Sequence, residues 1–236
     1  MTLTFSQDTL SQAEWHGLLT HAPHPVATQQ EWAYGDAAAL LGRKVRRFLW
    51  EESGQPLALC QWLERRWKGG FTLHLAMRGP IWLRQDVSAE LRAHVIQHCR
   101  EALPRNWRTL RILMPEALDD TAPLNTLGCK RLMTGHSTVM LDLMQDKDVL
   151  EARLDGKWRN RLRAAEKSDL QLLKSWNKAD HYEWLLTKEV QQREYAGYQA
   201  PTPALIPLYD AAGAGTKNLF CIRQMLGTTP SAAMLF

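Results

Sequence analysis

The sequence lacks the features of a membrane-spanning or exported chain. It contains no apolar stretch that approaches the roughly 18 residues of a membrane-spanning helix. Residues 1–12 hold neither a basic segment nor an apolar one, so they do not resemble a signal peptide. These two absences predict a cytoplasmic protein.

Motifs of covalent and metal-dependent catalysis are missing as well. No nucleophile motif, H-E-x-x-H or Walker sequence occurs, and the eight histidines do not pair at metal-ligand spacings. The sequence therefore predicts no metal, and favours a transfer reaction in which the positioning of two bound substrates supplies most of the rate. The cysteines lie far apart, which predicts buried free thiols at Cys60, Cys99, Cys129 and Cys221.

The composition is that of a packed globular protein. Hydrophobic residues make up 45% of the 236 residues and charged residues 23%, and the formal charge of +4 is too small to indicate nucleic-acid binding by itself. A chain of this length holds one large core or two compact ones, since domains usually run about 100–150 residues. We expect two domains, residues 1–143 and residues 144–236.

The hydrophobic pattern predicts an α/β protein with mixed sheets. In the first half, helices are expected at 9–20, 29–41, 87–103 and 121–127, and strands at 44–51, 57–66, 71–77, 108–114 and 131–143. In the second half, helices are expected at 147–154, 156–167, 178–195 and up to residue 212, and strands at 170–176, 218–225 and 231–236. Because the last strand is apolar and has no polar tail, we expect the second domain to be incomplete, with an exposed edge that favours a homodimer.

The sharpest local feature is the basic segment Lys157-Trp158-Arg159-Asn160-Arg161-Leu162-Arg163-Ala164-Ala165-Glu166-Lys167. On a helix, Arg159, Arg163 and Lys167 share one face, whereas Trp158, Leu162 and Ala165 are expected to form an inward stripe. Guanidinium groups one turn apart suit adjacent phosphates. The alternative is a solvated helix face that Glu166 partly neutralises.

A second feature is Arg78-Gly79-Pro80, between a predicted strand and a predicted helix. Backbone N–H groups at such a turn are suited to an anion. The alternative is a tight turn that needs glycine for freedom and proline for rigidity.

Taken in order, four stretches resemble the FemAB family over nearly the whole chain. They are Gln30-Glu31-Trp32, then Arg78-Gly79-Pro80-Ile81-Trp82, then the basic segment, then Gln192-Arg193-Glu194-Tyr195-Ala196-Gly197-Tyr198. The resemblance implies two GNAT-like domains that move an aminoacyl group from aminoacyl-tRNA to an amine of a peptidoglycan precursor, with no tightly bound cofactor. The substrate-binding residues that it implies are Trp32, Arg78, Gly79, Lys157, Arg159, Arg161, Arg163, Lys167, Arg193 and Tyr198; no catalytic residue is assigned.

The chain departs from the family pattern at one informative position. Family members often carry a lysine four residues after the tryptophan of the first motif, where it meets a substrate phosphate. Here that position is Asp36, and a carboxylate repels the same group.

Two other functions are compatible with the sequence. The first is an acetyl-CoA-dependent N-acetyltransferase acting on a small amine or sugar amine, although no Q/R-x-x-G-x-G/A pyrophosphate loop is evident. The second is a non-catalytic binding module whose incomplete second domain is completed by a partner.

Overall fold

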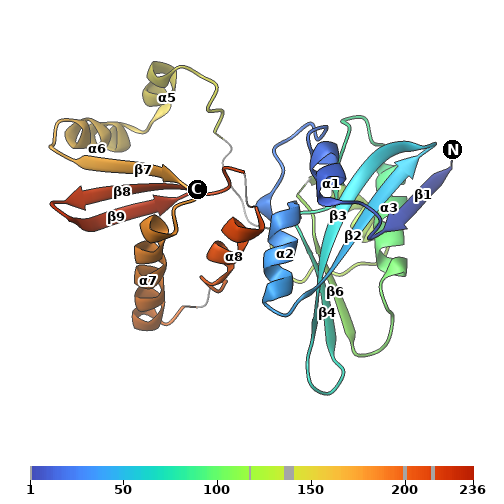
Figure 1. Ribbon diagram of the computed structural model, residues 1–236. Helices are drawn as coiled ribbons and strands as arrows, with labels where there is room; N and C mark the ends of the chain where they lie inside the picture. Colours follow the sequence, from blue (N-terminus) through green and yellow to red (C-terminus); the bar gives the residue numbers. More distant parts are fainter. Residues whose placement is uncertain (1, 117, 136–140, 199–200, 214–215) are drawn as a thin grey trace. The chain divides into compact units, whose positions relative to one another are not determined.

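The computed structural model describes residues 2–116, 118–135, 141–198, 201–213 and 216–236. The chain folds into two units (Figure 1). Unit 1 comprises Met1–Arg131 and Ala204–Ala214, and unit 2 comprises Leu132–Pro203 and Gly215–Phe236. These units differ from the predicted domains 1–143 and 144–236 in two respects. The boundary lies after Arg131 instead of after residue 143, and the segment Ala204–Ala214 belongs to unit 1. No helix in the described part of the chain is long and apolar enough to cross a membrane.

Unit 1 contains a six-stranded mixed sheet, as the α/β prediction required. The strand order is β1-β2-β3-β4-β6, with β5 beside β3, and every pairing is antiparallel except the parallel pair β4–β6. The strands are β1 (Leu3–Gln7), β2 (Lys44–Glu52), β3 (Gln55–Arg66), β4 (Thr72–Met77), β5 (Ile81–Trp82) and β6 (Thr109–Met114). The helices are α1 (Gln12–Leu19), η1 (Thr28–Gln30), α2 (Trp32–Leu40), α3 (Ala89–Ala102), η2 (Leu118–Asp120), α4 (Thr121–Thr126) and α8 (Leu205–Ala212).

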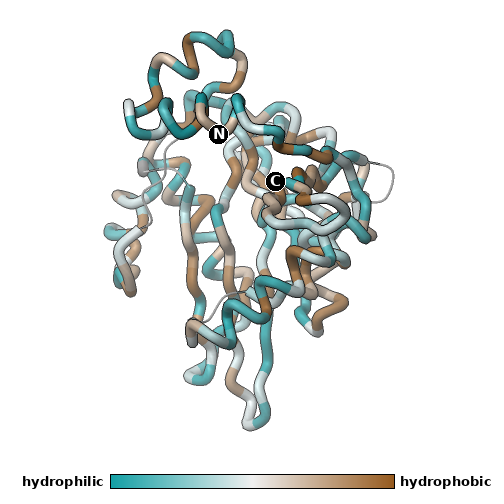
Figure 2. Tube along the Cα trace, turned by 90° about the vertical axis from the view of Figure 1, so that its left-hand side faces the viewer, coloured by the Kyte–Doolittle hydropathy of each residue, from teal (hydrophilic) through white to brown (hydrophobic). Residues whose placement is uncertain are grey.

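Alternation along the strands divides the core of unit 1 into two layers. Phe48 and Trp62 face α3 and pack with its Val95, whereas Leu49 and Leu59 face the other way and pack with other apolar residues. Successive strand side chains point to opposite faces, and both faces of β3 are covered, so its residues 57–60 are all apolar and buried. Figure 2 shows such hydrophobic stretches of the chain in brown and hydrophilic ones in teal. The buried ring of Trp15 in α1 completes the second layer.

A buried ion pair fixes the end of the sheet to α3. Asp120 of η2 accepts hydrogen bonds from Arg92 Nη1 at 2.9 Å and from Trp82 Nε1 at 3.2 Å. The Arg92 guanidinium also lies 4.7 Å from the centre of the Trp82 ring. Burial raises the pKa of Asp120 even though Arg92 favours its charged form. The three side chains therefore join α3, β5 and η2 in a site closed to water.

Unit 2 is built on a three-stranded antiparallel sheet of order β7-β8-β9. Its elements are α5 (Lys147–Arg153), α6 (Gly156–Glu166), β7 (Gln171–Trp176), α7 (Ala179–Ala196), β8 (Phe220–Leu226) and β9 (Thr229–Leu235). Tyr182 of α7 and Cys221 of β8 are buried, but apolar side chains such as Leu172 and Leu173 remain exposed. β7 and β9 are the two edges of this sheet within the described residues.

The structure corrects the sequence prediction at several points. Residues 131–135 and 141–143 form no strand, and the rest of the predicted strand at 131–143, residues 136–140, lies outside the described residues. Strands β1 and β5 were not predicted. In β1, Leu3 and Phe5 alternate with polar residues, but the segment is only five residues long, and β5 has only two residues. Cys129 is exposed, whereas Cys60, Cys99 and Cys221 are buried free thiols as expected.

Candidate functional site

Gln30 joins the first two sequence motifs in the interior of unit 1. Its side chain is fully buried, and its Nε2 donates to the carbonyl oxygens of Met77 at 2.7 Å and Gln61 at 3.3 Å. Its Oε1 accepts from the backbone N–H of Gln61 at 2.7 Å. A Cβ added at Gly79 would lie 2.8 Å from Gln30 Nε2, so only glycine fits there without displacing the amide. Gly79 therefore serves packing in this structure.

Arg47 organises the polar groups around the start of α2. Its Nη2 donates to the Trp32 carbonyl oxygen at 3.0 Å and to Asp36 Oδ1 at 2.7 Å, and its Nε donates to Gln61 Oε1 at 2.8 Å. Its guanidinium lies 3.5 Å from the centre of the half-buried Trp32 ring. Burial lowers the pKa of Arg47, and Asp36 acts in the opposite direction.

This arrangement changes the interpretation of Asp36. The sequence suggested a free carboxylate that would repel a phosphate. In the structure Arg47 pairs with that carboxylate, so the local charge is close to zero. Arg47 was not predicted because it lies in a strand beside Lys44 and Arg46, and nothing in the sequence distinguishes it from these neighbouring cations.

Glu31 completes the first motif by anchoring α8. The hydroxyl of Tyr209 in α8 donates a hydrogen bond to the Glu31 carboxylate. Burial, followed by this hydrogen bond, raises the pKa of Tyr209 well above its ordinary value. The contact ties a segment far along the chain to the start of α2 within unit 1.

We expect Gly35→Ala to destabilise unit 1 by about 2–3 kcal/mol, because overpacking of a filled site costs roughly 1–3 kcal/mol and the displaced hydrogen bonds add to it. A Cβ at this position would overlap Gln61 Oε1 and lie 2.6 Å from Arg47 Nη2. Urea unfolding measures the change. Gly17→Ala is the matched control, since Gly17 is also helical but has nothing within 4 Å of its added Cβ. Equal stability of the two variants would contradict the described packing.

Arg78 is held by an acidic partner that the sequence did not suggest. Its Nε and Nη2 donate to the two carboxylate oxygens of Glu116 at 2.6 and 2.5 Å. This pairing raises the pKa of Arg78 and lowers that of Glu116. Both side chains remain partly exposed, so an anionic ligand would compete with Glu116 for the guanidinium.

The basic helix α6 is more exposed than predicted. It has no buried residue, Trp158 is 62% exposed, and Ala165 also faces solvent, so the predicted inward stripe is wrong. The amphipathic pattern predicted an apolar face but did not show whether another element covers it. In the structure, α6 makes polar contacts with the short helix α5 instead.

Two of the α6 arginines bind groups of α5. Arg159 Nη2 donates to the carbonyl oxygens of Ala152 and Leu154 at 3.0 and 2.8 Å, at the C-terminus of α5. Arg163 Nε donates to Glu151 Oε1 at 3.0 Å. These cations therefore have a structural role, which the sequence pattern did not indicate.

The other predicted cations of α6 stay accessible. Arg161 lies 5.5 Å from the centre of the Trp158 ring, and the ammonium groups of Lys157 and Lys167 have no ion-pair partner among the described residues. Further along the chain, Arg193 and the Tyr198 hydroxyl both donate to Glu189 Oε1, at 3.3 and 2.9 Å. In unit 2 the predicted residues therefore fall into two groups, one on α6 and one around Glu189. In unit 1, Trp32 lies against Arg47, whereas Arg78 pairs with Glu116.

No group of three or more histidine, cysteine, aspartate or glutamate side chains in the described part of the chain has metal-binding geometry. The clustered groups are amides, guanidinium groups and aromatic rings. The buried amides and the Arg47 guanidinium make their hydrogen bonds within the protein, whereas exposed guanidinium groups and rings, such as Arg161 and Trp158, are suited to contacting an anionic or polar substrate.

Comparison with known proteins finds a fold relative. No family model matches the sequence, and no curated protein matches it. Among solved structures, the crystal structure of FemX matches with a TM-score of 0.69 and 16% sequence identity. The alignment covers 92% of this chain and 57% of the FemX chain, so the protein shares the FemX fold over nearly its whole length and spans little more than half the length of FemX.

Proposed function

We propose that this protein is an aminoacyltransferase of bacterial cell-wall synthesis, built from GNAT-like domains. The observation that carries the proposal is the similarity to the FemX fold, which extends over 92% of the chain. The packing of Gln30 adds support, because its amide binds the carbonyl oxygen of Met77, next to the second motif of the FemAB resemblance, and fills the space that a side chain at Gly79 within that motif would need.

The proposed reaction needs no metal and no covalent enzyme intermediate. An amine of a peptidoglycan precursor attacks the ester carbonyl of an aminoacyl-tRNA. An amide C–N bond forms, the ester C–O bond breaks, and the amine proton passes to the leaving ribose oxygen, which becomes a hydroxyl of the released tRNA. Because both substrates are large, holding them in a reactive geometry supplies much of the rate. The donor places this reaction in the cytoplasm.

On this proposal, accessible cations and rings contact the substrates. In unit 2 these are Lys157, Arg161 and Lys167, which are exposed and make no ion pair with described residues. In unit 1 they are Trp32 and Arg78, with Glu116 as the group that a phosphate would displace from Arg78. Arg47 neutralises Asp36, so no free carboxylate opposes an anion there.

We expect Arg161→Glu combined with Lys167→Glu to lower kcat/KM for aminoacyl transfer by roughly tenfold or more, since each hydrogen bond to a charged group contributes about 1.5–3 kcal/mol. The assay follows radiolabelled amino acid from aminoacyl-tRNA into a nucleotide-linked muropeptide. Lys174→Glu with Lys188→Glu is the control, because it makes the same charge change on β7 and α7.

The same assay separates the alternatives. Transfer from acetyl-CoA without transfer from aminoacyl-tRNA would replace the proposed donor. Equal activity of the two double variants would remove α6 from the substrate site. Failure of the full chain to transfer either acyl group would refute the enzymatic proposal.

A further inference from the structure

Two neighbouring loops at one end of the unit 1 sheet carry a concentrated positive charge. They are the β3–β4 hairpin, residues 65–72, and the α3–β6 connection, residues 104–111, which we call the tip loops. The tip loops contain six cations and no acidic residue, although the whole chain has a formal charge of only +4. The cations are Arg65, Arg66, Lys68, Arg105, Arg108 and Arg111.

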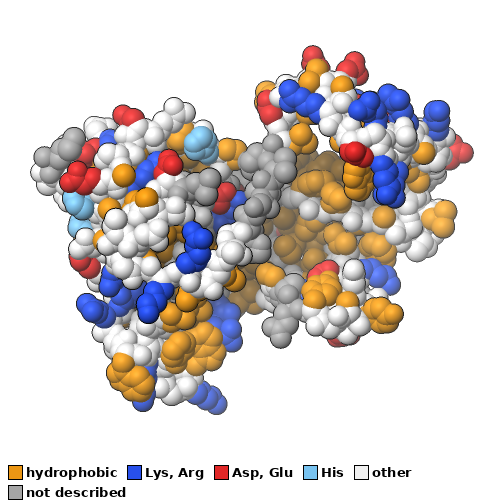
Figure 3. All heavy atoms as spheres, turned by 180° about the vertical axis from the view of Figure 1, so that it is seen from behind, with side chains coloured by type: hydrophobic (Ala, Val, Ile, Leu, Met, Phe, Trp, Pro, Cys, Tyr) orange, Lys and Arg blue, Asp and Glu red, His pale blue; other side chains and the backbone are white. Residues whose placement is uncertain are grey.

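Exposed aromatic rings lie between these cations. Trp67 is 37% exposed, Phe71 44% and Trp107 85%. Arg65 lies 4.6 Å from the centre of the Trp67 ring and Arg108 lies 4.3 Å from that of Trp107. Figure 3 shows blue and orange side chains side by side at the end of unit 1 where the β3–β4 hairpin lies. Rings and cations therefore alternate over one surface.

Hydrogen bonds hold the tip loops together. Arg108 Nη1 donates to the Gly69 carbonyl oxygen at 2.6 Å, and the Thr72 N–H donates to the Arg108 carbonyl oxygen at 2.9 Å. Gly69 and Gly70 both have positive φ, which allows the hairpin to turn tightly toward the second loop. A surface fixed in advance loses less entropy when a ligand binds.

A polar pocket of about 270 Å³ lies between the tip loops. Its walls include the Trp67 ring, the hydroxyl-bearing Thr72 and Thr109, and Asn106. Asn106 Oδ1 accepts from the Arg108 N–H and the Thr109 hydroxyl, and its Nδ2 makes no hydrogen bond with the described residues, so it can donate to a ligand. The pocket is slightly smaller than the roughly 300–1,000 Å³ of small-molecule sites, which suits one unit of a longer ligand.

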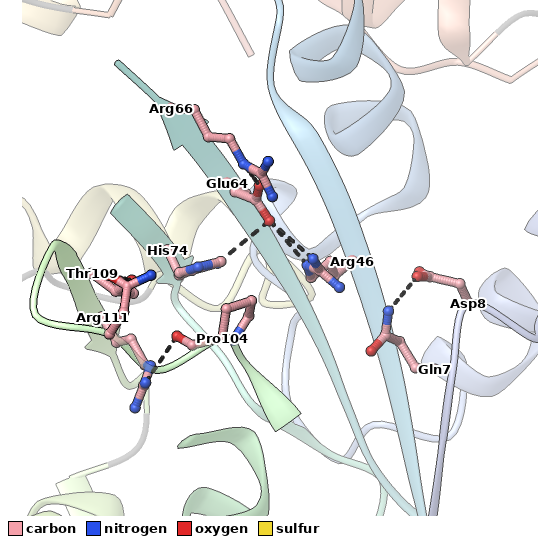
Figure 4. A network of polar contacts seen from close by, with 10 residues as sticks. Gln7, Asp8, Arg46, Glu64, Arg66, His74, Pro104, Thr109 and Arg111 are labelled. Carbon is pink, nitrogen blue, oxygen red and sulfur yellow. Dashed lines mark hydrogen bonds and ion pairs between the residues drawn. The ribbon is translucent and has the colours of Figure 1, made fainter. Parts of the chain in front are cut away.

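The lining of the pocket includes the imidazole of His74. His74 is fully buried, and neither ring nitrogen has a hydrogen-bond partner among the described residues. Its Nδ1 is 3.9 Å from Glu64 Oε2, and Glu64 also binds Arg46 at 3.1 Å and Arg66 at 2.5 Å (Figure 4). This cluster has more cations than carboxylates, so it favours an anion at the pocket.

We propose that the tip loops form a docking surface for single-stranded nucleic acid. Bases stack on the rings of Trp107, Trp67 and Phe71, the surrounding Arg and Lys side chains contact the phosphates, and one nucleotide enters the pocket. Aromatic platforms in a positively charged groove bind single strands in this way, because every base offers a flat face for stacking. The inference goes beyond the proposed acyl transfer and does not depend on it.

The pocket favours this ligand over a membrane surface. Exposed rings flanked by cations also suit the interface of an anionic bilayer. A flat bilayer surface, however, would leave unoccupied a pocket lined by an amide, two hydroxyl groups and an aromatic residue. A nucleotide combines a flat ring, hydrogen-bonding edges and a negative charge, and so matches each of these groups.

Fluorescence anisotropy of the full chain with a labelled, mixed-sequence RNA of about 12 nucleotides tests the proposal, at a length within the roughly 4–16 nucleotides of known single-strand sites. We expect Trp107→Ala to weaken binding by about fivefold or more, as for the loss of one base stack. Lys68→Glu with Arg105→Glu is expected to weaken it further and to reduce its dependence on salt, because fewer counterions are released.

Matched variants test whether RNA binding depends on the tip loops or on cations and exposed rings anywhere in the chain. Lys130→Glu with Arg131→Glu makes the same charge change elsewhere in unit 1, and Tyr195→Ala removes an exposed ring from α7. Both controls should bind RNA as the parent does, and a duplex of the same sequence should bind more weakly than the single strand.

Unchanged binding by Trp107→Ala would overturn the proposal, as would equal binding of duplex and single strand. Binding to phosphatidylglycerol vesicles but not to RNA would assign the surface to a membrane instead. Because no acyl transfer is measured, loss of the proposed enzymatic function would leave these outcomes unaffected.

Discussion

Gln30→Ala is expected to lower the free energy of unfolding by about 3 kcal/mol, since each buried group left without its hydrogen bond costs roughly 1–3 kcal/mol. The substitution removes the hydrogen-bond partner of the Met77 carbonyl oxygen and of the Gln61 N–H, both of which bind the Gln30 amide at 2.7 Å. It also opens a cavity between η1 and β3. Urea unfolding followed by circular dichroism gives the change in free energy.

Gln29→Ala is the matched control for this experiment. Gln29 precedes Gln30, but it contributes its carbonyl oxygen to Gln61 rather than its side chain, and it is only partly buried. We expect its loss to change stability by less than about 0.5 kcal/mol, as for most surface substitutions. If the two variants were equally stable, Gln30 would not be the link between the motifs.

The second large effect is expected at Asp120. Asp120→Ala should destabilise the protein by about 3–5 kcal/mol, the range for removing one partner of a buried ion pair. The variant leaves the buried Arg92 guanidinium without its carboxylate and Trp82 Nε1 without an acceptor. The loss should appear as a lower midpoint of thermal and urea unfolding.

The neighbouring Asp119 provides the control. Asp119 is exposed in the same 3-10 turn, and Asp119→Ala removes the same charge. Its expected effect is small, because exposed charges contribute little to stability. A similar loss of stability in both variants would mean that charge in the turn, rather than the buried pair, is responsible.

Most elements of the fold could be predicted because their periodicity is strong. The alternation at 71–77 predicted β4, and the pattern at 87–103 predicted α3, each within two residues of the observed bounds. The prediction was wrong at 131–135, where apolar residues are present but no neighbouring strand pairs with them. Strand formation depends on a partner, which a local pattern does not contain.

The candidate site was predicted less well. The motifs at Gln30 and Arg78 were found, but the residues that bind them, Arg47, Gln61 and Glu116, come from other segments and carry no local signal. In α6, the spacing of Arg159 and Arg163 predicted a common face, yet both side chains bind groups of α5. A charge pattern predicts which face of a helix a side chain lies on, but not which groups of other elements it contacts.

The sequence by itself determined the mixed α/β class, most helices and strands, the order of the FemAB-like motifs, and the position of the basic and aromatic segments. These properties follow from short-range periodicity and residue type. Only the tertiary structure decided that Arg47 neutralises Asp36, that the Gln30 amide binds the carbonyl oxygen of Met77, 47 residues away and next to the second motif, and that two basic loops meet around a pocket. Such contacts join residues distant in the chain, so their energies depend on the complete fold.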